Sequence, residues 1–296
     1  MLYYILKGLL IFFSKRPLEK VQRTGRILGC FLWHILKNRR KVAIVNARII
    51  GAEDPARTAK LSFEHTFSSY LEASYTHNIN AEFIRKYVTC EGREYYDKLV
   101  KTGEHFAILT AHMGSWELAA QVVPTLYGFK ALVAGRAAKN RSVERAIEYM
   151  RNVGNVVYIG GDGYIEKLSE YEKKGYYSAS LLDHGGTPGD SVLAPFFGYK
   201  VFTLAGLCAM CVRRKMPMLP CYLVRTASGF KVITRPPVYP AQGGDRKNKI
   251  ANMAALVNRE YEKIIREYPE QWYLIHRRFK RVAGDDGKIL TDMYKR

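Results

Sequence analysis

Short apolar segments alternate with amphipathic segments along most of the chain from residue 106 onward. The amphipathic segments repeat their apolar positions every three to four residues, as a helix does, and the apolar ones have the length of buried strands. Because parallel strands are joined by crossovers that are usually helices, the alternation predicts an α/β fold with a largely parallel central sheet flanked by helices. The predicted strands are 106–110, 131–135, 156–159, 177–182, 218–224 and 231–234, and the predicted helices are 116–126, 143–152, 164–174, 203–214 and 246–268.

The first hundred residues have a helical pattern instead. Residues 41–50 and 56–75 carry apolar side chains at helical spacing and are separated by Glu53-Asp54-Pro55, which breaks a helix. We therefore expect two parts: basic, apolar, membrane-associating helices over residues 1–50, and an α/β domain over residues 51–296. No segment rich in Pro, Gly or Ser separates them as a linker.

Positive charge is concentrated at the start of the chain. The whole chain has 47 Lys and Arg against 27 Asp and Glu, a net charge of +20, and residues 1–50 hold eleven of the basic residues against one acidic residue, Glu19. Such a field attracts polyanions, which include nucleic acid, anionic lipid and acidic proteins.

Two apolar segments accompany that charge, at 2–13 and 27–36. Each is too short to span a bilayer, which takes about 20 residues, but apolar segments with aromatic residues and basic flanks suit the interface of an anionic membrane. Core helices with basic ends are the alternative. A signal peptide is disfavoured because Lys7 interrupts the first segment and no small-x-small cleavage pattern follows it. Basic flanks fit the cytoplasmic side.

Five cysteines, an odd number, are sparse for 296 residues, which favours a reducing compartment over a disulfide scaffold. Cys208 and Cys211 lie in the apolar segment TLAGLCAMCV, and no second pair at zinc spacing accompanies them. Both are therefore predicted to be small core residues.

The sequence 111–117, Ala-His-Met-Gly-Ser-Trp-Glu, directly follows the predicted strand 106–110. Open α/β sheets bind ligands beyond the carboxyl ends of their strands, so His112 would lie at the binding edge. Gly114 permits a sharp turn, Ser115 would cap the next helix, and Glu117 would lie in its first turn. We expect this carboxylate to reach back to the imidazole, so that His112 can accept a proton from a hydroxyl. A histidine bonded to backbone at a strand end is the alternative.

A second cluster follows the predicted strand 131–135. Arg136 leaves that strand, and Lys139, Asn140 and Arg141 come next. Guanidinium and ammonium groups at a strand end suit a phosphate or an oxyanion. An ordinary solvated basic loop is equally consistent with the pattern.

A third cluster follows the strand 177–182. Asp183 opens a glycine-rich loop that extends to Asp190, and an apolar turn, Phe196-Phe197-Gly198, comes soon after it. The turn is expected to line a pocket for an apolar group. Nucleotide binding is disfavoured because neither G-x-x-x-x-G-K-[ST] nor G-x-G-x-x-G occurs.

Two other functional classes stay open at this point. The seven histidines are scattered without an H-E-x-x-H motif, but His112 and His184 could meet in space with Asp183 and Glu117, as a metal-dependent hydrolase would need. A basic, non-enzymatic protein that binds nucleic acid or a membrane is the other alternative. The basic segment 275–281 is expected to be a solvated or lipid-facing surface.

Taken together, these motifs resemble the late acyltransferases of lipid A biosynthesis, the lauroyl and myristoyl transferases, within the lysophospholipid acyltransferase superfamily. A lone His-x4-Glu is a weak signal, whereas several ordered blocks at compatible separations are a strong one. The blocks that carry the resemblance are Arg39-Arg40-Lys41 with Asn46, His112-x4-Glu117, Arg136-x3-Asn140, Leu182-Asp183 with Pro195-Phe196-Phe197-Gly198 and Thr203, and Pro269-Glu270-Gln271-Trp272 with His276-Arg277-Arg278-Phe279-Lys280.

The resemblance implies acyl transfer from a thioester, acyl carrier protein being the expected donor, to a hydroxyl of a membrane glycolipid, a lipid A precursor first of all. His112 would be the general base and Glu117 its orienting partner. Arg136, with backbone amides near Gly114, would stabilise the oxyanion or hold a phosphate. The other residues expected to bind substrate are Asn140, Asp183, Phe196, Phe197 and Gly198.

The resemblance implies no metal or redox cofactor and no nucleic acid partner, and it places the protein at the anionic surface of the cytoplasmic face of a bacterial inner membrane. The chain departs from the family's sequence pattern at two positions, and these affect the expected identity of the substrate more than the expected reaction. His184 stands where the family commonly has Gln after the Asp, and Tyr273 stands where it often has a second Trp. Another glycolipid, an aminolipid or a lysophospholipid is therefore the alternative acceptor.

Overall fold

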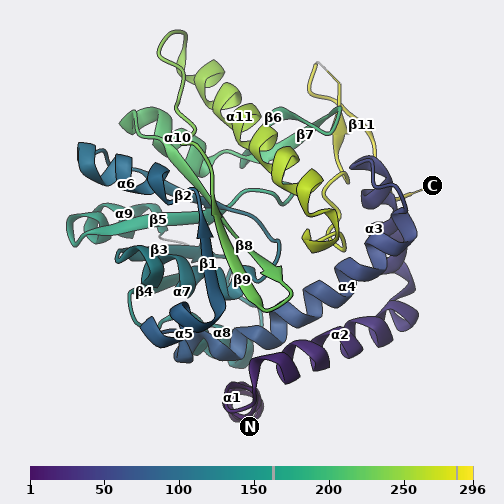
Figure 1. Ribbon diagram of the computed structural model, residues 1–296. Helices are drawn as coiled ribbons and strands as arrows, with labels where there is room; N and C mark the ends of the chain where they lie inside the picture. Colours follow the sequence, from purple (N-terminus) through teal and green to yellow (C-terminus); the bar gives the residue numbers. More distant parts are fainter. Residues whose placement is uncertain (162–163, 285, 296) are drawn as a thin grey trace.

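The computed structural model describes residues 1–161, 164–284 and 286–295 and is shown in Figure 1. The strands of its central sheet are β1 (Val88–Glu91), β2 (Ala107–Thr110), β3 (Lys130–Gly135), β4 (Val156–Gly160), β5 (Tyr176–Leu181), β8 (Met218–Thr226) and β9 (Gly229–Thr234). Within the described residues these seven strands are ordered β1-β9-β8-β2-β5-β3-β4. Every neighbouring pair is parallel except β8 and β9. The predicted α/β fold with a largely parallel sheet is confirmed.

Helices cover both faces of this sheet (Figure 1). They are α5 (Ala81–Tyr87), α6 (Arg93–Thr102), α7 (Trp116–Tyr127), α8 (Arg141–Arg151), α9 (Tyr164–Lys173), α10 (Gly206–Arg214) and α11 (Arg246–Glu267). Successive residues of β2 enter two different cores: Ile108 packs in the cluster that holds Leu118 of α7, and Leu109 in the cluster that holds Val257 of α11. A strand buried on both faces is apolar throughout, which explains the continuous apolar segments of the sequence.

A second sheet differs from the prediction. It consists of β6 (Ser191–Phe196), β7 (Tyr199–Leu204), β10 (Val282–Ala283) and β11 (Ile289–Thr291), in the antiparallel order β11-β10-β7-β6. The predicted helix 203–214 is therefore wrong at its start, because β7 occupies 199–204 and α10 begins at Gly206. A two-residue turn joins β6 to β7, with positive φ at Phe197 (45°) and Gly198 (78°). Left-handed conformations at both turn positions are typical of a tight hairpin, and Asn or Gly usually occupies them. Because phenylalanine stands at the first position here, the sequence does not indicate the turn.

The N-terminal helices are α1 (Leu2–Ser14), α2 (Leu18–Ile35), α3 (Lys37–Ile49) and α4 (Pro55–Glu72), followed by the 3-10 segment η1 (Ala73–Asn78). The strand β1 interrupts the helical pattern expected for the first hundred residues and forms one edge of the sheet. None of the helices in the described part of the chain combines the length and apolarity that crossing a membrane requires.

Figure 1 shows α2 lying alongside α4 at the lower edge of the molecule. A Cβ atom on Gly25 would stand 2.4 Å from Cα of Ser68, and one on Gly29 would stand 2.6 Å from Cα of Glu64. Real Cβ atoms do not approach other atoms so closely, so glycine at these two positions lets the two helix backbones touch. The helix α2 is therefore packed directly on α4.

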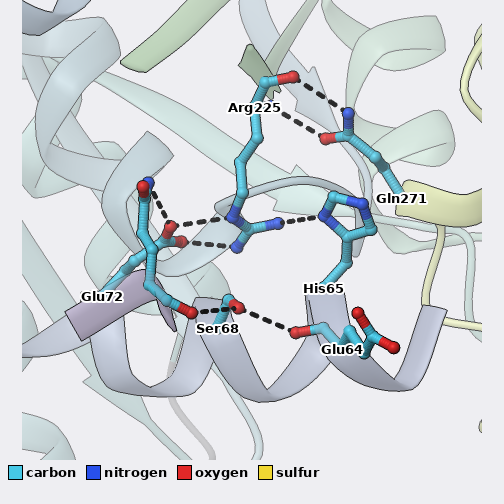
Figure 2. Close-up of polar contacts among 7 residues, drawn as sticks. Glu64, His65, Ser68, Glu72, Arg225 and Gln271 are labelled. Atoms are coloured by element: carbon cyan, nitrogen blue, oxygen red, sulfur yellow. Dashed lines mark hydrogen bonds and ion pairs between the residues drawn. The ribbon is translucent and has the colours of Figure 1, made fainter. Parts of the chain in front are cut away.

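A buried ion pair joins α4 to the end of β8 (Figure 2). Glu72 is fully buried, and Arg225 Nε donates to its Oε1 at 2.8 Å. Gln22 of α2 donates to the same oxygen at 2.9 Å, and Gln271 exchanges hydrogen bonds of 2.8 and 3.0 Å with the backbone of Arg225. His65 accepts from Arg225 at 3.2 Å. Burial, together with the charge of Arg225, lowers the pKa of His65 to about 3, so this ring is neutral at pH 7.

Replacing Glu72 by Gln is expected to lower the free energy of unfolding by about 3 kcal/mol, because it leaves the guanidinium of Arg225 buried without its counter-charge. Urea unfolding followed by circular dichroism measures the change. Asp97→Asn is the matched control: it breaks an exposed pair with Arg93 on α6, which is expected to cost less than about 1 kcal/mol. Equal losses in the two variants would contradict the structural role of the buried pair.

Candidate active site

The register of β2 and β5 brings together two residues that are far apart in the sequence. The strands are parallel neighbours, with Thr110 opposite Leu181. His112 lies two residues beyond Thr110, and Asp183 lies two residues beyond Leu181. Both side chains therefore leave the sheet at the same level of its carboxyl edge, which is where open α/β sheets bind ligands.

Asp183 is buried and accepts three hydrogen bonds, two from His112 and one from Trp272. Its Oδ1 lies 2.8 Å from Nδ1 of His112, and its Oδ2 accepts from the backbone N–H of His112 at 2.9 Å and from Nε1 of Trp272 at 3.0 Å. Burial alone would raise the pKa of Asp183, but the charge and the hydrogen bond of His112 hold it below its usual range. An ionised carboxylate only accepts, so Nδ1 of His112 carries a proton, and in the neutral ring it is Nε2 that holds the free lone pair.

Two further histidines continue a stack that begins at His112: His184 lies on His112, and His276 lies on His184. The ring centroids of His112 and His184 are 3.7 Å apart with planes at 6°, and those of His184 and His276 are 3.8 Å apart with planes at 10°. Burial, followed by the charge of His112, lowers the pKa of His184 to about 2; burial also lowers the pKa of His276 to about 4. Both rings are neutral at pH 7, so the stack holds the imidazole of His112 without adding a like charge.

The side chain of His112 is 21% exposed, so its ring can be reached from outside. Trp116 and Tyr273 lie beside it, with ring centroids at 6.0 and 6.1 Å. The Tyr273 hydroxyl is hydrogen-bonded to that of Tyr70 on α4 at 3.1 Å. An aromatic wall of this kind is apolar and suits an acyl chain next to a basic nitrogen.

Glu117 does not contact the imidazole, so the expected pairing of Glu117 with His112 is wrong in this structure. The carboxylate of Glu117 instead forms a two-pronged ion pair with Arg151 of α8, at 2.8 and 3.1 Å. It does lie in the first turn of α7, as predicted. With four residues between it and His112, Glu117 lies on the side of α7 that faces α8, whereas the segment that follows the neighbouring strand β5 supplies the carboxylate for His112.

The turn at 113–115 is fixed by backbone contacts. Gly114 has φ of +55°, and a Cβ atom there would stand 2.0 Å from the carbonyl oxygen of Leu223, so the predicted need for glycine is confirmed. The amide of Gly114 donates to Gln271 O and that of Ser115 to Leu223 O, both at 2.9 Å. These amides are therefore not free to stabilise an oxyanion, contrary to expectation. Ser115 is at the N-cap of α7, but its hydroxyl makes no capping bond.

The predicted substrate-binding residues after β3 are at the surface. Arg136 is exposed and has no polar partner among the described residues. Asn140 accepts hydrogen bonds from the backbone of Ser142 and Val143, at 2.9 and 3.3 Å, and so caps α8. A helix cap is a sufficient structural reason for Asn140.

Phe196 and Phe197 are buried in the core behind Trp272. The ring centroid of Phe196 is 5.9 Å from that of Trp272 and 5.8 Å from that of Phe279. Gly198 is exposed at the hairpin turn. The predicted contact of these residues with a substrate stays a prediction.

Two expectations about cysteine and metal chemistry can be compared with the structure. Cys208 and Cys211 are fully buried, and burial raises the pKa of both thiols, which confirms their place in the core. In the part of the chain that the structure describes, no group of three or more His, Cys, Asp or Glu side chains is arranged to hold a metal ion. His112 and His184 do meet, as expected, but face to face.

Sequence reasoning assigned Asp183 to substrate binding and missed the roles of Trp272 and Tyr273 around His112. A usable signal existed for Asp183, since it follows its strand at the same offset as His112. Trp272 stood in one of the blocks that carry the resemblance, but the sequence did not place it beside His112, because its backbone bridge to Met113 joins segments more than a hundred residues apart.

A comparison with protein families gives a match over most of the chain. The family model described as bacterial lipid A biosynthesis acyltransferase matches residues 1–281. No curated protein matches the chain. Among solved structures, the 1-acyl-sn-glycerophosphate acyltransferase of Thermotoga maritima is 16% identical with a TM-score of 0.35, covering 82% of this chain and 97% of that one. On its family match, this chain belongs to the bacterial lipid A biosynthesis acyltransferases, which are acyltransferases that act on lipids.

Proposed function

We propose that this protein transfers a fatty acyl group from the thioester of an acyl carrier protein to a hydroxyl of a membrane glycolipid, a lipid A precursor. The observation that carries the proposal is the buried carboxylate of Asp183, which holds Nδ1 of His112 at 2.8 Å and leaves Nε2 as a base at the carboxyl edge of the sheet. Among the described residues no Ser or Cys is hydrogen-bonded to this imidazole, which suits direct attack by the acceptor hydroxyl.

In the proposed reaction, Nε2 of His112 accepts the proton of the acceptor hydroxyl while its oxygen bonds to the thioester carbonyl carbon. The tetrahedral intermediate collapses, the carbon–sulfur bond breaks, and the imidazolium returns the proton to the departing thiolate. The products are an ester and a free thiol. Asp183 stabilises the imidazolium between the two steps, as the acid of a hydrolase triad does.

The other predicted residues keep narrower roles in this proposal. Arg136, an exposed cation just beyond the end of β3, stabilises the oxyanion or holds a substrate phosphate. Glu117, fixed by Arg151, contributes a carboxylate at the start of α7. Asn140 orders the loop that carries Arg136 through its cap of α8. Phe196 and Phe197 support the apolar side of the site through Trp272, and Gly198 allows the tight turn that follows them.

A transfer assay tests this function. Purified protein is incubated with acyl carrier protein or acyl-coenzyme A as donor and a bacterial lipid extract as acceptor, and the products are read by mass spectrometry. We expect one acyl group to be added to a phosphorylated glucosamine lipid, with the carrier protein as the better donor. Transfer to a lysophospholipid or an aminolipid instead would overturn the proposed acceptor, and absence of any transfer by folded protein would overturn the reaction.

We also propose that residues 1–50 hold the α/β domain, residues 51–296, against an anionic membrane at the cytoplasmic face. Residues 162–163, 285 and 296 of that domain lie outside the described structure. In α1, all of which is described, no residue is fully buried. The large apolar side chains exposed on α1 and α2 are Leu2, Tyr4, Ile5, Leu9, Ile11, Phe12, Ile27, Phe31 and Ile35. Exposed apolar side chains beside basic ones are typical of an interfacial helix.

Replacing both Ile27 and Phe31 by Glu is expected to weaken binding to phosphatidylglycerol vesicles at least tenfold. Each side chain is 61% exposed, so its burial in lipid contributes about 1.5 kcal/mol or more without affecting the core. Vesicle co-sedimentation measures the effect. Val100→Glu, at a 48% exposed apolar position on α6, is the control and should bind as the wild type does. Unchanged binding by the double variant would remove α2 from the proposed interface.

A further inference from the structure

A basic pocket of about 210 Å³ opens at the far end of the histidine stack from His112. His276 lines it, and so do five cationic residues: Arg39, Arg277, Arg278, Lys280 and Arg281. Arg39 comes from α3 and the others from the segment after Trp272, so the two ends of the chain build the pocket together. The remaining wall consists of Gly185, Gly186 and Phe202. The segment 275–281, expected to be a solvated or lipid-facing surface, is partly buried and forms a concave site.

Positive charge in this pocket exceeds negative charge by a wide margin. Among the described residues that line it, none is Asp or Glu; Asp292 forms an ion pair with Arg277 at 3.5 Å, and Asp183 acts on Arg278 through its charge without an ion pair. Arg39 and Arg281 donate to backbone carbonyl oxygens, at 3.3 and 3.0 Å. Lys280 is exposed, and its ammonium group makes no polar contact within the described residues. A concave cluster of cations that outnumber the nearby carboxylates favours an anionic ligand.

Among the cations of this pocket, Arg278 is the one whose burial costs the most folding free energy. It is 2% exposed, and it donates only to neutral oxygens, Phe202 O at 2.8 Å and Thr203 Oγ1 at 2.9 Å. Burial lowers its pKa to about 10, so the side chain is still charged at pH 7. The charge of Asp183 partly offsets this burial, but no carboxylate forms an ion pair with Arg278 among the described residues, so a ligand that brought an opposite charge would stabilise it.

Three consecutive residues that line the pocket each keep a buried nitrogen without a hydrogen-bond partner in the described part of the chain. These atoms are Nδ1 of His276, Nε of Arg277 and Nε of Arg278. Buried polar atoms are nearly always satisfied in folded proteins; the two guanidinium Nε–H groups are donors, and Nδ1 of His276 is a third in the tautomer that protonates it, so the cavity favours a partner with several acceptor oxygens. A phosphate group fits this need, since its oxygens accept several hydrogen bonds and pair with guanidinium groups.

We propose that this basic pocket binds a phosphate ester of a substrate and so positions that substrate against Nε2 of His112. The inference rests on the proposed function, because that reaction has two phosphate-bearing substrates, a phosphorylated lipid and the phosphopantetheine arm of the acyl carrier protein. Both offer the same chemistry to the pocket. The histidine stack is the rigid connection between the phosphate site and the base.

Two single substitutions test the pocket without touching the buried residues. Lys280→Gln and Arg39→Gln each remove one exposed charge, and Lys247→Gln, at an exposed position on α11, is the matched control. KM is measured for a phosphorylated glucosamine lipid and its dephosphorylated form, and for acyl carrier protein and a phosphate-free acyl-pantetheine thioester. We expect each pocket variant to raise KM about tenfold for one phosphorylated substrate, with KM for its phosphate-free form and kcat unchanged.

The substrate that is affected identifies the source of the phosphate. If KM rises only for the phosphorylated lipid, the pocket binds the acceptor. If KM rises only for the carrier protein, the pocket binds the donor. An equal rise for the phosphate-free forms, or no difference from Lys247→Gln, would overturn the proposal.

A binding measurement keeps the pocket testable if no transfer is found. Inorganic phosphate is added at constant ionic strength, and the midpoint of thermal unfolding is followed for the wild type and the same three variants. We expect phosphate to raise the midpoint of the wild type and of Lys247→Gln more than that of Lys280→Gln or Arg39→Gln. Equal shifts in all four proteins would overturn the phosphate site, whereas absent transfer with unequal shifts would overturn only the proposed reaction.

Discussion

The His112→Ala substitution is expected to reduce kcat of acyl transfer about a thousandfold or more, because it removes the group placed to accept the proton of the acceptor hydroxyl. General base catalysis typically contributes a factor of about 10² to 10⁴. The structure makes His112 suited to this role through the hydrogen bond of Nδ1 to Asp183 at 2.8 Å and a side chain that is 21% exposed. Initial rates of product formation, measured by mass spectrometry at saturating donor and acceptor, give the change in kcat.

The control for this experiment is His105→Ala, which removes an exposed histidine that lies before β2 rather than after it. This control variant is expected to keep kcat within about twofold of the wild-type value. Since His112→Ala also removes a partner of a buried carboxylate, His112→Gln is measured beside it, and thermal unfolding shows whether each variant is folded. Transfer at more than a tenth of the wild-type rate by folded His112→Ala would contradict the assignment of the base.

Much of the fold could be predicted from the sequence because both faces of the central sheet are buried. The strands β2, β3 and β4 are continuous apolar segments for that reason, and the helices that cover them show a clear three-to-four periodicity. The hairpin of β6 and β7 could not be predicted in the same way. Its turn has Phe197 rather than Asn or Gly at the first position, and β7 is followed at once by α10, so one apolar stretch of sequence contains two kinds of structure.

The candidate site was predicted in part. His112 and Asp183 were both selected because each follows a predicted strand, but the partner assigned to the imidazole was Glu117. Spacing along the chain favoured Glu117, whereas the contact with Asp183 depends on which strands are neighbours. That β5 rather than β3 lies next to β2 is a property of the sheet order, which one sequence does not reveal.

The Asp183→Asn substitution is expected to reduce kcat about a thousandfold, with KM nearly unchanged, because it reverses the tautomer of His112. Oδ2 of Asp183 accepts from two donors, the backbone N–H of His112 and Nε1 of Trp272. In the variant the amide oxygen would keep that position, which turns the new NH₂ group toward Nδ1 of His112. Nδ1 must then accept a hydrogen bond, so the proton moves to Nε2 and the base loses its free lone pair.

Nitrogen-15 NMR of the imidazole distinguishes this mechanism from a general loss of structure. In the wild type, Nδ1 of His112 is expected to give the signal of a protonated ring nitrogen, and in Asp183→Asn that signal is expected to belong to Nε2. Trp272→Phe removes one donor to Oδ2 but keeps the carboxylate, so it should keep the wild-type tautomer. Glu117→Gln should keep it as well, because Glu117 pairs with Arg151 and not with the imidazole. A tautomer that changes in Glu117→Gln and persists in Asp183→Asn would return the orienting role to Glu117.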